Sequence, residues 1–414
     1  MSHAQPSVAL VVVAFNHAAY LPATLRALDA LEYAPRPQIL LVENGDGSSA
    51  AVARAHGGID VLEPGRNLGF AGGCNLAVAQ TQAEIVVLIN PDLEPRPAFL
   101  REIVAPLTDR EVGVVGARLL YPDGRTLQHA GGLLHQPLLL SDHLGYGQPD
   151  GAQFSRSQDV EFVTGAAMAL RRSDWQMLGG LDETFFPAYY EEVDLCLRAR
   201  QRGLRVRYAP EAIALHIEAA GLGRRSAAYY QLYHRNRLRL LFKHQSDEWL
   251  LRIWLPAELT HLRTTADDSE IAGLLDAYLY WQMLFLRGAD AADQVAANPP
   301  PPTPIAGELH WTVEQVRAKQ RITPLPFRSR WPLAARLRGW LNRISVEEYL
   351  RPLIQQQNDY NAALAELAQA LERQRRTTDA AIACQGALLA KMLGARPIAV
   401  GATDAAADAH IADR

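Results

Sequence analysis

A carboxylate and an amide follow the apolar run Ile85–Leu88, in the segment Ile89–Asp92. A buried strand that ends in such side chains can hold a divalent cation against a diphosphate, because hard cations prefer oxygen ligands. Asp92 is the candidate direct ligand, and His216 is a candidate nitrogen ligand that suits Mn²⁺ better than Mg²⁺. The alternative interpretation is a turn, since Pro and Asp are turn formers, and a lone histidine is more often structural.

Three carboxylates lie within the four residues Glu191–Asp194. Carboxylates this close raise one another's pKa, which suits a general base. The alternative is that the acids favour the N-terminus of a helix. The aromatic stretch Phe185–Tyr190 before them and Arg198 after them favour a site.

Two further segments end predicted strands and are candidates for binding a nucleotide. Ala14, Phe15 and Asn16 offer backbone groups and an aromatic ring to a nucleobase. Glu43 can accept hydrogen bonds from a base N–H or from ribose hydroxyls. Taken alone, each segment is also explained by ordinary strand-to-loop chemistry.

A glycine-rich loop is predicted at Gly69–Gly73, after Asn67. Glycine lets a backbone approach a ligand closely. The spacing does not fit GxGxxG, and the loop does not follow the first strand, so a Rossmann dinucleotide site is disfavoured. The alternative is a helix entry that needs glycine for packing.

The elements that must position these residues alternate between strand and helix. Expected strands are 8–15, 39–42, 60–62, 85–89, 112–117, 205–208 and 213–215. Expected helices are 20–31, 49–56, 72–81, 99–107, 195–202 and 226–245, and residues 118–160 are predicted as a long loop region. Short alternation of this kind predicts an α/β fold with a mainly parallel central sheet, which would bring the strand ends to one edge.

Composition bounds the function. The 414 residues are 49% hydrophobic, enough for one large core with an appendage. A net charge of −4 indicates no nucleic-acid partner. Three distant cysteines disfavour a disulfide framework and a zinc site. Without a signal peptide or an apolar run of membrane-spanning length, we expect a cytoplasmic protein, at most attached to the inner face of the cell membrane.

The predicted domains are residues 1–245 as the α/β domain, 246–297 as a helical extension, 298–310 as a proline-rich linker, 311–395 as a helical region and 396–414 as a disordered tail. Residues 328–344 place Trp on the apolar side of a basic helix. That pattern fits a membrane-surface helix, and equally a helix packed on the first domain. Heptad-like spacing over 360–393, broken around 374–378, suggests a short coiled coil and a homo-oligomer.

Eight motifs, in order and at compatible spacing, carry a family resemblance: Val11–Asn16, Val42–Gly45, Asn67–Asn75, Asn90–Asp92, Val163–Met168, Gly179–Phe186, Tyr190–Arg198 and His234–Asn236. Residues 8 to about 245 resemble family 2 glycosyltransferases of the GT-A fold, in particular bacterial rhamnosyltransferase-like members.

The resemblance implies an inverting single displacement that depends on Mg²⁺ or Mn²⁺. It assigns the metal to Asp92, with Asn90 in place of the first Asp of an Asp-x-Asp-like element, and to His216. It assigns the base to Glu192, where the family has Asp, with Asp194 as the alternative and Glu191 beside them. The nucleotide sugar is assigned to Ala14, Phe15, Asn16, Glu43, Asn67, Gly69, Gly72, Asn75, Asn90 and Gly165.

The implied partners are a dTDP- or UDP-sugar donor, with rhamnose as the family-based choice of sugar, and a glycan or lipid-linked acceptor. Two rival hypotheses remain. A sugar nucleotidyltransferase would carry a Lys/Arg-rich glycine loop near the N-terminus, which the sequence lacks. A non-catalytic scaffold is supported only by the departures at Asn90 and Glu192.

Overall fold

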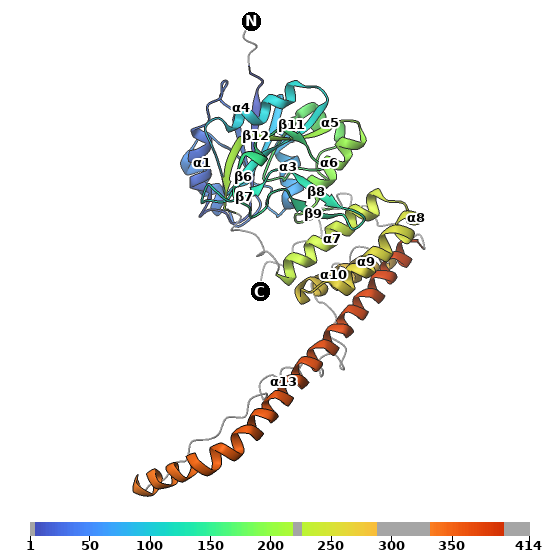
Figure 1. Cartoon of the computed structure of the whole chain (residues 1–414). Coiled ribbons are helices and arrows are strands. Elements are labelled where there is room, and N and C mark those ends of the chain that lie inside the picture. Colours follow the sequence, from blue (N-terminus) through green and yellow to red (C-terminus); the bar gives the residue numbers. More distant parts are fainter. Residues whose placement is uncertain (1–4, 218–225, 288–331, 393–414) are drawn as a thin grey trace. The chain divides into compact units, whose positions relative to one another are not determined.

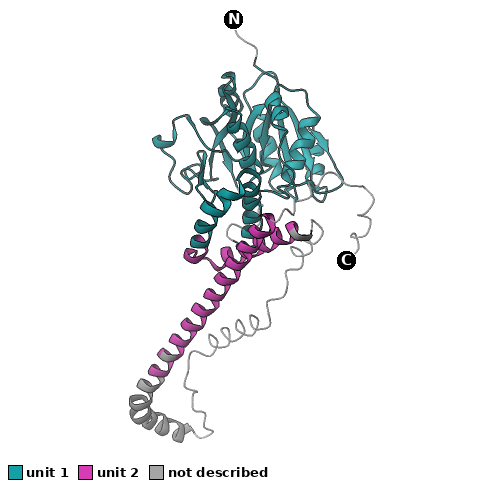
Figure 2. Cartoon of the chain, turned by 90° about the vertical axis from the view of Figure 1, so that its right-hand side faces the viewer, with its two compact units in different colours: residues 1–260, 398–414 teal, residues 261–397 magenta. Residues whose placement is uncertain are grey.

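The computed structural model describes residues 5–217, 226–287 and 332–392, apart from the side chains of 332–354 and 360 (Figure 1). The chain forms two compact units that divide between Thr260 and His261 (Figure 2). The predicted linker at 298–310 and the predicted tail at 396–414 lie outside the described residues.

A ten-stranded sheet forms the centre of the first unit. Its strands are β1 (Val8–Ala14), β2 (Gln38–Glu43), β3 (Asp60–Leu62), β4 (Ile85–Ile89), β5 (Leu93–Pro95), β6 (Val112–Leu120), β7 (Leu127–His129), β10 (Gln158–Asp159), β11 (Ala167–Arg171) and β12 (Arg205–His216). The order is β10-β12-β6-β11-β4-β1-β2-β3, with β5 paired to β12 and β7 to β6. β11 runs antiparallel between β4 and β6, while β4-β1-β2-β3 and β12-β6 are parallel.

The continuous apolar runs explain why this sheet is covered on both faces. Every residue of β1 and β4 is buried. Strands without polar alternation require such burial. The helices of this α/β layer are α1 (Leu21–Asp29), α2 (Ser48–His56), α3 (Gly69–Ala79), α4 (Phe99–Val104), η1 (Ala105–Thr108), α5 (Arg172–Leu178) and α6 (Glu191–Gln201). The predicted α/β fold with a mainly parallel sheet is confirmed.

The prediction of a long loop over 118–160 was wrong. Besides β7 and β10, this region forms β8 (Gly132–His135), β9 (Leu140–His143) and η2 (Ala152–Phe154), and β8 and β9 make a separate two-stranded sheet. These pieces have at most four residues each, too few for a period-two pattern to show. The two strands expected at 205–208 and 213–215 are one strand, β12, with an irregularity between Ala209 and Ile213.

The remaining helices are α7 (Ala227–His244), α8 (Asp247–Trp249), η3 (Leu250–Trp254), α9 (Leu255–Thr264), α10 (Asp268–Arg287) and α13 (Pro332–Met392). α13 continues without interruption through 374–378, and within the second unit it packs against α10. The side chains of the predicted membrane-surface segment at 328–344 lie outside the described part of the chain. In the described residues, no helix has the length and apolarity needed to cross a membrane.

Candidate active site

The segment after β4 forms a turn that is fixed from two sides. The Asn90 N–H donates to the Ala166 carbonyl at 2.9 Å, and the Thr24 hydroxyl of α1 donates to the Pro91 carbonyl at 2.7 Å. The turn interpretation is therefore correct for the backbone. It also places the Asp92 carboxylate at the edge of the sheet, where the candidate metal site was predicted.

Asp92 and His216 lie side by side. β5 pairs with the end of β12, with Leu93 opposite His216, so residues over 120 positions apart meet. Asp92 Oδ1 is 3.2 Å from His216 Nε2. Asp92 is only 4% exposed, and its Oδ1 accepts no hydrogen bond in the described part of the chain. A buried oxygen without a donor is a site that a cation can satisfy.

Gln128 of β7 fixes the orientation of the His216 ring. The Nδ1 atom of His216 lies 2.6 Å from Gln128 Oε1, so Nδ1 carries the proton and donates it. Nε2 then faces Asp92 and the Asn90 amide, 3.3 Å away. A proton on Nε2 would bond to Asp92, and a bound cation would replace that proton. Metal-ligating histidines are oriented in this way by a partner on the other ring nitrogen. Sequence reasoning missed Gln128, because its short strand gave no pattern.

Asp92 is ionised at neutral pH. Burial raises its pKa, but interactions with His216 and with the nearby His17 outweigh burial, and the pKa lies below its ordinary value. His17 follows β1 and was also missed by the sequence analysis. A carboxylate held in its charged form is what a divalent cation requires.

The residues present fit a Mg²⁺ or Mn²⁺ ion that keeps part of its coordination shell for substrate. Two ligands about 2.1 Å from an octahedral cation are separated by roughly 3 Å, close to the spacing between Asp92 and His216. In the described residues, no group of three or more His, Cys, Asp or Glu side chains gathers as a metal site. Donor phosphates and water would complete the shell, as is usual for Mg²⁺.

The carboxylate of Glu43 shapes the loop between β2 and α2. Oε1 accepts from the Gly45 N–H at 2.7 Å, and Oε2 accepts from the Ala50 N–H at 2.8 Å. Asn16 has a left-handed backbone, with φ of 59°, and its Oδ1 accepts from the Asp46 N–H of the same loop. The two residues together hold the loop beside the end of β1.

The end of β1 also presents an exposed ring. Ala14 is fully buried, whereas Phe15 is 50% exposed. An exposed aromatic side chain at the carboxyl end of a parallel strand is placed where ligands bind in open α/β sheets. Of Ala14 and Phe15, Phe15 is thus the one whose side chain is available to a nucleobase.

The glycine-rich segment is the first turns of α3 and not a loop, which corrects the prediction. Gly69 begins the helix with φ of 70°, and a Cβ there would lie 2.8 Å from the Pro187 carbonyl. A Cβ on Gly73 would lie 2.7 Å from a methyl group of Val13 on β1. These glycines allow close packing, which was the alternative interpretation. Asn67 accepts from the Gly69 N–H at 2.8 Å and closes the helix entry.

Two asparagines connect this helix entry to its neighbours. Asn44 donates to the Gly69 carbonyl at 2.8 Å. Asn75 donates to the Leu181 carbonyl at 2.8 Å and accepts from the Leu181 N–H at 3.0 Å. Gly72 faces the same segment, since a Cβ there would lie 3.7 Å from the Glu183 carboxylate. The motifs Asn67–Asn75 and Gly179–Phe186 are therefore parts of one packed structure.

The acidic cluster forms the first turn of α6 and does not precede the helix. Asp194 is fully buried and pairs with Arg198 at 2.7 Å, Lys243 at 2.8 Å and His244 at 2.7 Å. Burial raises its pKa, but these partners outweigh burial and bring it below the ordinary value. Asp194 is committed to ion pairs that join α6 to α7, so it is poorly placed to take up a proton.

The environment of Glu192 raises its pKa, whereas that of Asp194 lowers it. Its Oε2 is buried and has no hydrogen-bond partner in the described residues. Burial raises its pKa to about 7, although backbone amides of the helix start act against this. Glu191 beside it is buried too, and burial followed by the charge of Glu192 raises the pKa of Glu191 well above its ordinary value. Glu192 can therefore exchange a proton near neutral pH.

Gly165 and Ala166 connect the two halves of the site. A Cβ on Gly165 would lie 2.9 Å from the Phe70 ring and 3.7 Å from Glu192 Cβ, so a larger residue there would displace the ring. The next carbonyl, of Ala166, accepts from Asn90. The antiparallel β11 begins here, and its start therefore lies at the same sheet edge as the end of β4.

Helix α7 holds the segment that leads into Glu192. The amide of the buried Asn236 donates to the carbonyls of Phe185, Ala188 and Tyr189 at 3.2, 2.8 and 3.1 Å. Tyr189 and Tyr190 both have left-handed backbones, with φ of 81° and 72°. Such conformations cost about 1–3 kcal/mol each and cluster at functional sites. The sequence analysis named the motif around Asn236 but gave it no role.

A fully buried ion pair supports α7, and its removal gives a stability prediction. Arg237 donates to both carboxylate oxygens of Glu258, to one of them at 2.9 Å. We expect Arg237→Met to lower the free energy of unfolding by about 3–5 kcal/mol, because the buried Glu258 carboxylate would lose both hydrogen bonds from the guanidinium. Urea denaturation measures the change. Arg237→Met/Glu258→Leu should recover most of it, and a double variant as unstable as the single one would contradict the explanation.

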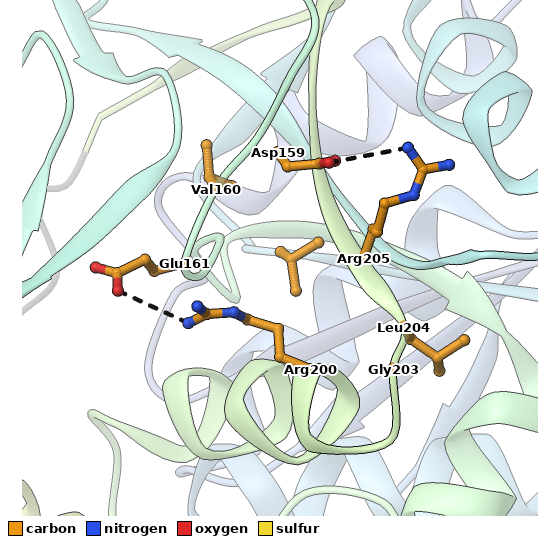
Figure 3. A pocket seen from close by; sticks show the side chains of 8 residues that line it. Asp159, Val160, Glu161, Arg200, Gly203, Leu204 and Arg205 are labelled. Atoms are coloured by element: carbon orange, nitrogen blue, oxygen red, sulfur yellow. Dashed lines mark ion pairs between the residues drawn. The ribbon is translucent and has the colours of Figure 1, made fainter.

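A separate pocket of about 370 Å³ lies between the end of α6 and the start of β12 (Figure 3). Its arginines are matched by acids: Arg200 pairs with Glu161 at 3.8 Å, and Arg205 with Asp159 at 3.8 Å. It lies at the opposite end of β12 from His216, so it is not part of the site.

The chain belongs to the family described as glycosyltransferase-like family 2, which matches residues 5–241. The O-antigen biosynthesis protein RfbC of Myxococcus xanthus is 32% identical over 47% of this chain and 15% of its own length. The N-acetylglucosaminyl-diphospho-decaprenol L-rhamnosyltransferase of Mycobacterium tuberculosis is 26% identical over 58% of this chain and 85% of its own length. The chain spans only 25% and 15% of two of the relatives that it matches.

Among solved structures, GalNAc-T7 with UDP, GalNAc and Mn²⁺ is 14% identical, with a TM-score of 0.47 over 58% of this chain and 48% of that one. The family match confirms the predicted resemblance to family 2 glycosyltransferases, and the mainly parallel sheet confirms the predicted α/β class of fold.

Proposed function

We propose that this protein is an inverting, metal-dependent glycosyltransferase that transfers a sugar from a nucleoside diphosphate to a glycan or lipid-linked acceptor. The observation that carries the proposal is that two acidic residues with opposite pKa shifts belong to the same edge of the sheet. Asp92 is kept ionised beside His216, and Glu192 has a pKa of about 7 beside Gly165. The first arrangement suits a cation and the second suits a base.

Asp92 and His216 would hold Mg²⁺ or Mn²⁺, with Asn90 beside them. A bound divalent cation supplies charge that stabilises the leaving diphosphate. Gln128 keeps the lone pair of His216 directed at that position. Phe15 and the loop held by Glu43 and Asn16 would bind the base and ribose of the donor.

Glu192 would remove the proton from the acceptor hydroxyl as that oxygen attacks the anomeric carbon. One C–O bond forms to the acceptor, and the C–O bond to the diphosphate breaks on the opposite face, so the configuration inverts. The proton passes to Glu192, and the diphosphate leaves with the bonding electrons. A base with pKa near the working pH is the most effective for such a transfer.

The donor is proposed to be a dTDP- or UDP-sugar, and rhamnose is the favoured sugar because a relative is named an L-rhamnosyltransferase. That relative's name also supports a lipid-linked acceptor. Attachment to the inner membrane surface would suit such an acceptor, and oligomerisation through 360–393 remains a proposal.

The test is release of nucleoside diphosphate from dTDP-, UDP- and GDP-sugars with Mn²⁺, Mg²⁺ or EDTA. We expect release from one donor class, stopped by EDTA. Because many transferases need their acceptor, donor binding is measured by calorimetry in parallel. A protein that neither cleaves nor binds any of these donors would contradict the proposal and favour the scaffold hypothesis.

Gln128 gives a graded prediction for the metal site. We expect Gln128→Leu to weaken Mn²⁺ binding by about 10- to 100-fold, because His216 loses the acceptor that sets its tautomer. Activity should return at high Mn²⁺ concentration, since both ligands remain. Electron paramagnetic resonance titration of free Mn²⁺ measures the change. Equal Mn²⁺ affinity in the variant and the parent protein would refute this role.

A further inference from the structure

Aromatic side chains gather where α7 faces the segment before Glu192. Tyr189 contacts Tyr229 with ring centroids 5.5 Å apart, and Tyr229 lies against Tyr230 at 5.4 Å. Tyr229 is stacked on Tyr233 at 5.6 Å, and Tyr230 is stacked on the buried His234 at 5.8 Å. The mechanism proposed above uses none of these rings.

The cluster has two layers. Tyr190 is buried, and its hydroxyl donates to the Leu139 carbonyl at 2.9 Å. The Tyr233 hydroxyl accepts from the Ser141 N–H at 2.9 Å. These two rings are anchored to β9 and its approach. Tyr189, Tyr229 and Tyr230 are half-buried, and Tyr229 rests on the anchored Tyr233 ring.

One residue of the outer layer, Tyr189, lies close to the proposed base in the sequence. Tyr189 is three residues before Glu192, and its left-handed backbone is held by the Asn236 amide. Two consecutive tyrosines with left-handed backbones cost conformational free energy, and they lie immediately before the acidic turn. The Tyr189 ring meets α7 at Tyr229, with an interplanar angle of 80°.

We propose that Tyr189, Tyr229 and Tyr230 form the platform on which a pyranose ring of the acceptor stacks. The C–H groups on one face of a pyranose carry partial positive charge, and the face of an aromatic ring is negative. Stacking on tyrosine therefore holds a sugar without requiring a unique hydroxyl pattern. This inference rests on the proposed function, because it supplies the acceptor to Glu192.

The experiment measures binding of four octyl glycosides, β-D-glucoside, β-D-galactoside, β-N-acetyl-D-glucosaminide and α-L-rhamnoside, by saturation-transfer NMR on the full chain. We expect saturation of the ring C–H protons of at least one glycoside. Tyr229→Ala and Tyr230→Ala should each weaken that binding by about five- to tenfold, while Tyr229→Phe and Tyr230→Phe retain it. Tyr33→Ala is the matched control, since this half-buried tyrosine bonds to Pro6, before the opposite end of β1.

Donor turnover separates this inference from the proposed function. Nucleoside diphosphate release without acceptor, or donor binding, should be unchanged in Tyr229→Ala and Tyr230→Ala, and thermal melting confirms that both variants fold. Unchanged glycoside binding in the alanine variants would overturn the platform while leaving the transferase intact. No saturation of any glycoside by the parent protein would overturn it as well.

Discussion

Glu192→Gln is expected to lower the rate of sugar transfer by about 10²- to 10⁴-fold, the range that a positioned general base contributes. The amide matches the carboxyl in size but cannot accept the acceptor proton. Donor affinity should stay within about twofold, because the change leaves Asp92 and His216 in place. Single-turnover kinetics with a saturating donor measures the rate of the chemical step.

The neighbouring residue is the control for this prediction. Glu191 is buried, and burial together with the charge of Glu192 raises its pKa well above the ordinary value. This favours the neutral carboxylic acid, which the amide of Glu191→Gln resembles. We expect its activity to remain within a few-fold of the parent. In the parent, activity should rise with pH through about 7, as Glu192 loses its proton. A Glu192→Gln variant with more than a tenth of the parent rate would exclude Glu192 as the base.

Asp92→Asn is the second large prediction. We expect donor cleavage to fall by at least about 10³-fold, because the cation that Asp92 is proposed to hold would lose this anionic ligand and be less able to stabilise the diphosphate. Mn²⁺ affinity should fall in parallel, as calorimetry or paramagnetic resonance would show. Asp159→Asn is the control, since Asp159 is an acid of the same sheet that pairs with Arg207 at 3.1 Å, far along β12 from His216.

The outcome that contradicts this role is separable from misfolding. Asp92 is buried, so melting temperature and circular dichroism of the variant are measured first. A folded Asp92→Asn that keeps both Mn²⁺ affinity and donor cleavage would place the cation elsewhere. His216→Gln should give a smaller loss than Asp92→Asn, because it removes a neutral ligand.

The central sheet could be predicted because its strands carry their own signal. β1 and β4 are unbroken apolar runs, and their burial on both faces follows from composition alone. The candidate site residues that follow these strands could be identified for the same reason. The region 118–160 could not, since its strands are too short for periodicity. β7, β8 and β9 pair with neighbouring strands, and β10 is ordered by pairing with the distant β12.

The roles of the acidic residues depended on contacts that no local pattern reports. Sequence left Glu192 and Asp194 as alternatives for the base. The distinction comes from Lys243 and His244, which reach Asp194 from the far end of α7, some 50 residues away. The Gln128 contact to His216 likewise joins residues 88 positions apart. Spacing in one sequence identifies the acids that could serve as a base. Contacts made in the folded chain decide which of them can take up a proton.

The acidic turn of α6 also affects how the whole domain responds to protons. In the unfolded chain Glu191 and Glu192 titrate near the ordinary value of 4.5, and in the folded chain both titrate higher. The folded state thus binds more protons than the unfolded state between these values, and folding at neutral pH takes up protons from the solvent. Because burial disfavours the charged forms of these two glutamates, their contribution to stability falls as pH rises from about 4.5 past 7. The residue that is proposed to accept one proton in each turnover thus also takes part in the uptake of protons when the chain folds.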